Sequence, residues 1–375
     1  MFEASIGRPL LSRRGAFFQR TRWLLYLDLS LQQALLSQRL DVRDLEIVRL
    51  ILEGNSVIDW NRVRFTSRAD VDRFLELHLI DLEDPEDFRR IHFVHAEAVN
   101  YLQEHLGLHF PEDIKNPEDI RDLFVMASET GRFRRRQIQA CVILKLMHVI
   151  NHLEAAELRF QTPLSEADLL DLAERRIVAA ADKLREQGFP LVSFYGSRKT
   201  RNSIITKLLA KKDTIAATIF DKLRFRVVTR EKDQVLPAVS WLKDHLFPFN
   251  YVIPGQSHNN LVSLKALLEK PDYSALQKEL APFQDTMVPE DNPFSGASYR
   301  MINFIVDFPV RVDHLVNVRY GSLLGRTVFV LVEFQVLDEA TAKANDEGEN
   351  AHELYKERQN KIVAARLRKG VAASE

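Results

Sequence analysis

The chain has 375 residues, a formal net charge of −1, 46% hydrophobic and 28% charged residues, and one cysteine. This length is enough for two or three domains, and the near-zero charge gives no overall field that would favour nucleic acid or a membrane surface. The single Cys141 excludes an internal disulfide framework and Cys-based zinc clusters, and it favours a reducing compartment.

The N-terminal segment carries several arginines followed by the apolar stretch WLLYLDLSL (23–31). This stretch is short, Asp28 interrupts it, and no small-residue cleavage pattern follows, so we do not expect a signal peptide. No other stretch of the sequence is long enough for a membrane span. We therefore expect a cytoplasmic protein without a membrane partner.

The first half of the sequence predicts helices. Apolar residues recur at spacings of three and four, and several segments begin with Ser, Asp or Pro, as helix starts do. The predicted helices cover residues 41–54, 67–80, 85–107, 117–128, 134–160 and 163–188. In the last of these, Ser165 is the expected N-cap and Gly188 the expected stop.

From Phe189 onward the pattern changes to strands. Strands are predicted at 189–196, 222–229, 299–308 and 327–336, with helices at 203–212 and 234–247 and a polar helical ending from 338. We expect an α+β fold in which a helical region of unknown role (1–160) precedes a mixed, roughly five-stranded sheet with flanking helices (161–365). Residues 366–375 are expected to form a frayed tail.

The segment between Gly196 and Arg230 is strongly basic, with ten Lys or Arg residues and only two acidic residues. A solvated helix face explains part of the run at 207–212. It explains Arg224 and Arg226 less well, because they alternate with apolar residues on a predicted strand and so form a one-sided basic stripe. Such a stripe fits a polyanion, either a triphosphate or RNA.

The strand VFVLVEFQV (328–336) contains two polar residues, Glu333 and Gln335, which point to the same face. One interpretation is a solvated sheet face. The other is that Glu333 converges with Asp221, at the start of the basic strand, to hold Mg²⁺ on a phosphate. For Asp221 the alternative is a simple pairing with a neighbouring Arg.

His148 and His152 lie four residues apart on a predicted helix, a spacing that can place two imidazoles on one metal. The pattern is not His-Glu-x-x-His and no third ligand is evident, so we do not predict a metal site there. The sequence also contains no His-Asp dipeptide, and we assign no metal-dependent hydrolase.

The order of the C-terminal segments resembles the synthetase domain of RelA/SpoT enzymes, which make (p)ppGpp, over roughly residues 165–360. Lys199, Ser203 and Lys207 match a basic strand-loop and helix, and Asp221 and Arg226 match an Asp-bearing strand. Tyr299 and Glu333 match a Tyr strand and a Glu-x-Gln strand. The matching segments are 192–212, 219–228, 251–260, 295–306, 332–336 and 351–356.

The resemblance implies pyrophosphate transfer from ATP to the 3′-hydroxyl of a ribonucleotide such as GDP or GTP. It implies Asp221 and Glu333 as the catalytic, Mg²⁺-binding carboxylates. The residues expected to bind ATP phosphates, including the basic stripe, are Arg198, Lys199, Ser203, Lys207, Arg224 and Arg226. Those expected to bind the acceptor are Tyr299, Asn303 and Gln335.

The sequence also departs from the family pattern. Ser197 stands where the family has an ATP-binding Arg, Ser298 replaces a Gly, Asn303 replaces a His, and Leu337-Asp338 replaces Arg-Thr. These changes put the acceptor in question and leave three alternatives open. The acceptor can be an adenine nucleotide or the 3′ end of an RNA such as tRNA. The domain can be a catalytically impaired nucleotide-sensing or RNA-binding module. The protein can be a helical interaction protein whose second half only looks similar.

Overall fold

The computed structural model describes residues 40–53, 65–129, 134–210, 222–269, 298–313, 324–347 and 352–372. Within these ranges the chain is an α+β protein, with helices first and a mixed sheet second, as the sequence predicts. The helices before the sheet are α2 (Val42–Glu53), α3 (Arg68–Leu77), α4 (Pro85–Leu106), α5 (Glu112–Lys115), α6 (Arg121–Ser128), α7 (Arg134–Gln161) and α8 (Glu166–Glu186).

Capping residues define the helix ends. Ser165 accepts a hydrogen bond from the Asp168 backbone N–H, and the Asp168 side chain accepts one from the Ser165 N–H, so α8 begins with a capping box. Gly188 follows the end of α8 with a φ of 76°, in the left-handed region that favours glycine. The predicted start and stop of this helix are both confirmed.

A five-stranded sheet forms the second half, in the order β1-β2-β5-β4-β3. Strand β2 pairs with β5 in parallel, and the other pairs are antiparallel. The strands are β1 (Leu191–Arg198), β2 (Leu223–Thr229), β3 (His258–Asn259), β4 (Ile302–Arg311) and β5 (Thr327–Asp338). The two-residue β3 was not predicted, because so short a strand carries no readable alternation.

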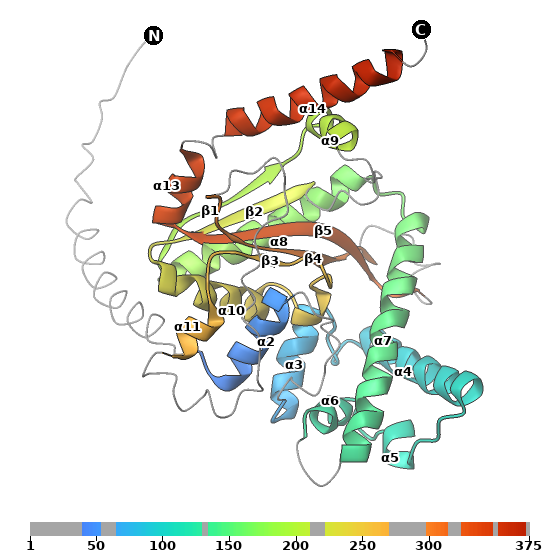
Figure 1. The fold of residues 1–375 in the computed structure, drawn as a ribbon. Helices are drawn as coiled ribbons and strands as arrows, with labels where there is room; N and C mark the ends of the chain where they lie inside the picture. Colours follow the sequence, from blue (N-terminus) through green and yellow to red (C-terminus); the bar gives the residue numbers. More distant parts are fainter. Residues whose placement is uncertain are drawn as a thin grey trace, which may run out of the picture.

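Short helices connect and follow the strands: α9 (Arg201–Ala210), η3 (Lys232–Gln234), α10 (Val235–His245), η4 (Phe249–Tyr251), α11 (Leu264–Leu268), α13 (Glu339–Asp346) and α14 (His352–Ala372). Figure 1 shows α14 and α9 beyond the β1 side of the sheet and α2, α10 and α11 at the opposite side. Arg366 on α14 donates a hydrogen bond to the Leu209 carbonyl on α9 (3.1 Å).

One face of the sheet is apolar and forms much of the core. Phe225, Phe304 and Phe334 lie side by side on this face, and Phe247, just after α10, packs on Phe334 with ring centroids 5.2 Å apart. Arg176 on α8 crosses the same face, with its guanidinium 4.9 Å from the Phe308 ring centroid. Helix α8 and the α10 segment therefore cover this face and leave the polar alternation to the other face.

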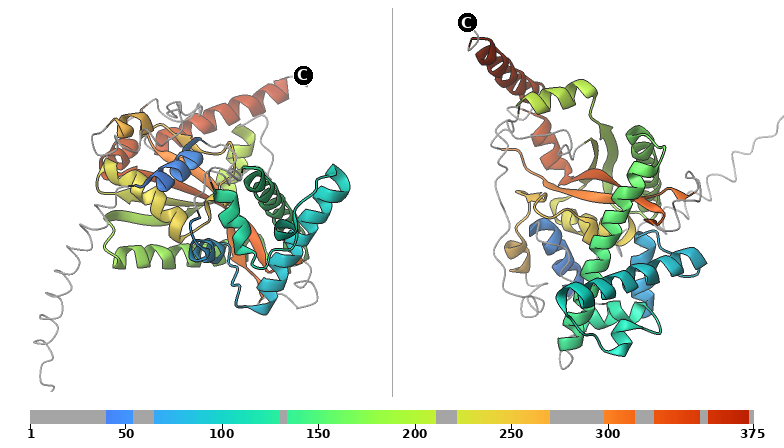
Figure 2. Two further views of the ribbon diagram at one scale, coloured as in Figure 1. Left: turned by 90° about the horizontal axis from the view of Figure 1, so that it is seen from below. Right: turned by 90° about the vertical axis from the view of Figure 1, so that its right-hand side faces the viewer.

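The helical region and the sheet share one continuous cluster of buried apolar side chains. Helix α7 connects them, since it extends from α4–α6 to the sheet (Figures 1 and 2). His152 on α7 stacks on Phe329 of β5, with ring centroids 4.2 Å apart and an interplanar angle of 15°. None of the helices in the described ranges is both long enough and apolar enough to cross a membrane.

Candidate functional site

The strand register places the predicted polar residues on one face of the sheet. Arg224 on β2 lies opposite Glu333 on β5, and Arg226 lies opposite Gln335. On the other side of β5, Gln335 lies opposite Asn303 of β4. Because side chains alternate along a strand, these residues all point away from the phenylalanine face. The predicted one-sided basic stripe is thus part of a wider polar row across three strands, which we call the polar row.

Glu333 is the centre of the polar row. Its side chain is buried, with 3% of the residue exposed, yet both carboxylate oxygens have partners. Oε2 accepts a hydrogen bond from Arg224 Nε at 2.7 Å, and Oε1 accepts one from Gln335 Nε2 at 3.0 Å. A buried carboxylate needs such a counter-charge and donors. The paired polar residues of VFVLVEFQV are therefore a charged cluster and not a freely solvated face.

The two amides of the polar row present acceptor oxygens. The amide nitrogen of Gln335 donates to Glu333, so the amide oxygen of Gln335 points away from that carboxylate. Gln335 Oε1 and Asn303 Oδ1 are both buried, and neither has a hydrogen-bond partner among the described residues. Two neighbouring unsatisfied acceptors are suited to a ligand that brings N–H or O–H donors, such as the amino group of a nucleobase.

Arg226 lies between two tyrosines at the same face. Its Nη2 donates to the Tyr299 hydroxyl at 3.3 Å, and its Nη1 lies 3.4 Å from the carboxylate of Asp346 on α13. Burial lowers the pKa of Arg226, but Tyr299, Tyr195 and Asp346 more than offset this and raise the pKa above its usual value. The guanidinium is therefore a fixed positive charge beside an aromatic ring, a combination suited to phosphate and base.

The other predicted phosphate ligands are at the end of β1, directly after it, and on α9. Arg198 belongs to the opposite alternation of β1 and pairs with Asp171 (2.5 Å) and Glu174 on α8. Lys199 follows β1 and donates its backbone N–H to the Lys222 carbonyl at 3.1 Å. Ser203 and Lys207 are on α9, where the Ser203 hydroxyl lies 3.0 Å from that of Thr200.

Asp221 precedes β2 and lies outside the described residues. Among the residues that are described, no group of three or more His, Cys, Asp or Glu side chains is arranged to hold a metal ion. Glu333 is bound by the Arg224 guanidinium and the Gln335 amide, so a cation at this carboxylate would share it with Arg224. The described residues on their own therefore do not form a Mg²⁺ site.

Two residues that support this face were missed from the sequence. Asn345 on α13 is 2% exposed and holds the Arg300 backbone from both sides, accepting from its N–H (3.0 Å) and donating to its carbonyl (2.7 Å). This fixes the segment that carries Tyr299. Asp338, one of the departures from the family pattern, is the N-cap of α13 and accepts from the Thr341 N–H at 3.0 Å. The sequence Asp-x-x-Thr is typical of an N-cap and could have predicted the role of Asp338, whereas no sequence pattern marks a single Asn such as Asn345 within a polar helix.

Comparison with known proteins finds similar solved structures but no matching sequence family. No protein-family model and no curated protein matches the sequence. Small alarmone synthetase 1 from Bacillus subtilis matches 56% of this chain and 90% of its own, at 14% identity and a TM-score of 0.30. A GTP pyrophosphokinase family protein from Streptococcus pneumoniae matches 56% and 87%, at 13% identity and a TM-score of 0.28. Small alarmone synthetase 2 from B. subtilis matches 55% and 98%, at 16% identity and a TM-score of 0.26.

These structures bear the name of the activity that the sequence resemblance implies. Their TM-scores and identities are low, however, so the function of this chain has to be argued from its own residues. The polar row supplies two guanidiniums, two amide acceptors and an aromatic ring on one face of a sheet.

Proposed function

We propose that the polar row binds nucleotides and that the protein transfers pyrophosphate from ATP to the 3′-hydroxyl of a ribonucleotide. The observation that supports this most is the joint placement of Arg224 and Arg226 beside Gln335, Asn303 and Tyr299. Guanidiniums bind phosphate oxygens in a bidentate manner, and amide and aromatic groups recognise bases. A nucleotide contains both a phosphate and a base, and the distance between them is about that spanned by a few residues of a strand.

In the proposed reaction the 3′-oxygen of the acceptor attacks the β-phosphorus of ATP, AMP leaves, and the hydroxyl proton passes to Glu333. Arg224 and Arg226 stabilise the charge that develops on the phosphate oxygens. Tyr299, Asn303 and Gln335 bind the acceptor. The proposal assigns Mg²⁺ to Asp221 and Glu333, where it would neutralise phosphate charge. Arg224 would then have to share Glu333 with the cation.

The test is transfer of label from [β-³²P]ATP to a panel of GDP, GTP, AMP, ADP and tRNA. Wild type is expected to label one acceptor, and Asp221→Asn and Glu333→Gln are expected to lose about a hundredfold or more of the rate. The matched control is Glu339→Gln, at the first residue of α13 and outside the polar row, which should keep full activity. Full transfer by Glu333→Gln would refute the catalytic assignment.

A second function is favoured by the Arg224–Glu333 pair. With both oxygens of Glu333 bound by Arg224 and Gln335, nucleotide binding would need no metal to neutralise this carboxylate. In this reading the protein senses nucleotides, or binds RNA, and transfers nothing. Equilibrium binding of ATP and GTP with and without EDTA separates the two. Binding that survives EDTA, with no transfer to any acceptor, supports the receptor. Absence of both binding and transfer refutes both proposals.

A further inference from the structure

The polar row continues onto a fourth strand. His258 on β3 lies opposite Asn303 of β4. Asn303 lies opposite Gln335 of β5, which in turn lies opposite Arg226 of β2. Because residues directly opposite each other share a face, these four side chains form one line across the sheet. Adjacent strands are about 4.8 Å apart, so the line measures about 14 Å between its outer Cα atoms.

The two ends of this line differ in charge. At the β2 end Arg226 keeps its positive charge beside the Tyr299 hydroxyl. Beyond Arg226 the line consists of two amides and an imidazole. A ligand with an anionic part and an uncharged part is therefore expected to place its anion over β2. For a nucleotide, this puts the phosphates at Arg226 and the base towards β4 and β3.

The middle of the line presents two acceptor oxygens side by side. Gln335 Nε2 donates to Glu333, which fixes the orientation of the Gln335 amide because a carboxylate only accepts. The Ile305 carbonyl accepts from the Ile253 N–H at 2.9 Å, so Ile305 directs its main chain away from β5. Asn303, two residues earlier, does the same, and its side chain therefore lies at the shorter of the two antiparallel spacings from Gln335.

A base that carries an exocyclic amino group satisfies both of these oxygens. Gln335 Oε1 and Asn303 Oδ1 are buried without a hydrogen-bond partner among the described residues. An amino group has two N–H donors on one nitrogen, whereas an oxo group in its place only accepts. Adenine, guanine and cytosine carry this group, and hypoxanthine and uracil lack it. A base without the amino group leaves the two buried acceptors unsatisfied, which weakens its binding.

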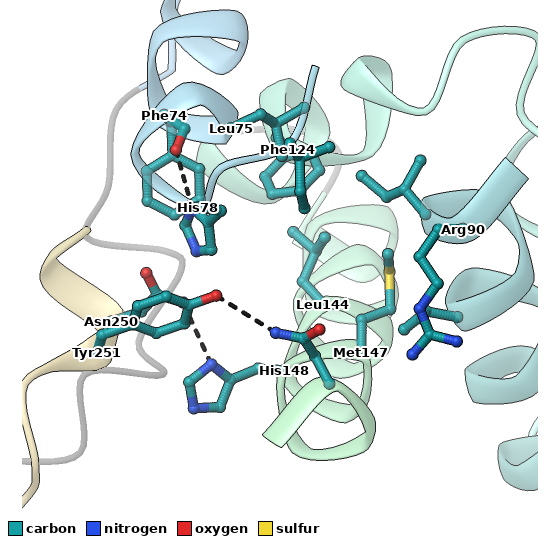
Figure 3. Close-up of a pocket in the computed structure, with 14 residues that line it drawn as sticks. Phe74, Leu75, His78, Arg90, Phe124, Leu144, Met147, His148, Asn250 and Tyr251 are labelled. Atoms are coloured by element: carbon teal, nitrogen blue, oxygen red, sulfur yellow. Dashed lines mark hydrogen bonds between the residues drawn. The ribbon is translucent and has the colours of Figure 1, made fainter. Parts of the chain in front are cut away.

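Strand β3 is short, yet it is held on both sides. Before it, η4 is fixed on α7, since the Asn250 amide nitrogen donates to His148 Nδ1 at 3.2 Å (Figure 3). After it, Asn260 accepts from the Met301 N–H at 2.7 Å and donates to the Tyr299 carbonyl at 2.8 Å. The position of the β3 backbone relative to β4 and to the Tyr299 segment is therefore fixed.

We propose that His258 is a specificity-determining residue of the nucleotide site and that the site selects bases with an exocyclic amino group. The amino group donates to Gln335 Oε1 and Asn303 Oδ1. The His258 imidazole contacts the adjoining edge of the base, where it can donate or accept. This inference rests on the proposed function for nucleotide binding, and it adds the class of base and the residue that borders it.

The test is equilibrium binding by calorimetry on the full chain, with IDP as the reference for GDP and ADP, and UDP as the reference for CDP. The members of each pair share ribose and diphosphate, so the ratio of their affinities reports on the base alone. The preferred amino-bearing nucleotide is expected to bind about tenfold more tightly than its reference. Equal affinities within every pair would overturn the selection and leave the proposed function in place. Wild type that binds none of the five nucleotides would contradict nucleotide binding by the polar row, and this inference with it.

Variants assign the effect to residues. His258→Ala should weaken binding of the preferred nucleotide about tenfold, whereas His105→Ala, in the last turn of α4, should not change it. Asn303→Leu has a similar volume, removes one acceptor oxygen and should lower the affinity ratio several-fold. Unchanged affinity in His258→Ala would refute the role of His258, and an unchanged ratio in Asn303→Leu would refute the amino-group contact. The comparison of nucleotides on wild type stands even where a variant does not fold.

Discussion

The protein is expected to lose stability steeply as the pH falls from 7 to 4, because a buried histidine, His78, and two partly buried ones, His148 and His152, cluster where α3 and α7 approach the sheet. Burial lowers the pKa of His78 to about 4, of His148 to about 3 and of His152 to about 4. Asp307 lies 3.5 Å from His152, and burial raises its pKa to about 6. The pKa values of the three histidines are lowered and that of Asp307 is raised, so the histidines and Asp307 change the stability in opposite directions as the pH falls.

The signs follow from which state binds the proton. A histidine whose folded pKa is depressed contributes fully above its unfolded pKa of about 6.5, and the contribution is lost as the pH falls, since only the unfolded chain takes the proton. Asp307 has a raised folded pKa, so its contribution is lost as the pH rises from about 4 to about 6. Near pH 5 the three histidines outweigh Asp307 by roughly two protons, or about 3 kcal/mol per pH unit.

The assay is urea unfolding at pH 7, 6 and 5, with the slope of free energy against pH compared among variants. His78→Gln removes one titrating group, so its slope near pH 5 should fall by about 1.4 kcal/mol per pH unit. Asp307→Asn removes the opposing group and should steepen the slope by a similar amount. Identical slopes in wild type and His78→Gln would refute the burial argument, whatever the absolute stabilities.

Three further changes test the packing between elements by urea unfolding. Asp87 is 5% exposed and accepts from Arg311 at 2.8 Å, so Asp87→Ala should cost about 3–5 kcal/mol; a loss below about 1 kcal/mol would contradict a buried pair. Lys243, with 2% of its side chain exposed, pairs with Asp44 at 2.9 Å and with Asp244 at 2.7 Å. The double variant Asp44→Ala, Asp244→Ala leaves this ammonium unpaired and should therefore destabilise more than Lys243→Met, which removes the buried ammonium; the reverse order would be wrong for this geometry. Ser165→Ala should cost about 1 kcal/mol through the lost cap, and no change would mean that α8 begins elsewhere.

Local patterns predicted the elements well because their causes are local. The Ser165 cap, the Gly188 stop and the alternation around Arg224 and Arg226 depend on neighbours within a few residues, and the structure reproduces each of them. The polar pair Glu333 and Gln335 was also recognised as unusual.

Pairing between distant segments could not be predicted in the same way. That Arg224 is the partner of Glu333 follows from the parallel register of β2 and β5, which no local pattern specifies. Arg198 pairs with Asp171 on α8 because it falls on the other alternation of β1, and the register of β1 on β2 is likewise not specified by a local pattern. The contact of Asn250 with His148 likewise joins residues about a hundred positions apart.

The helical region acquires a structural role from its contact with β5. His152 stacks on Phe329, and Tyr251 packs edge-on against the same ring with centroids 4.9 Å apart. Phe329 lies four residues before Glu333 on one strand, which is about 13 Å along β5. Strand β5 is hydrogen-bonded on both sides, to β2 and β4. The packing of α7 and η4 on Phe329 therefore helps to hold the same strand that carries the Arg224–Glu333 pair.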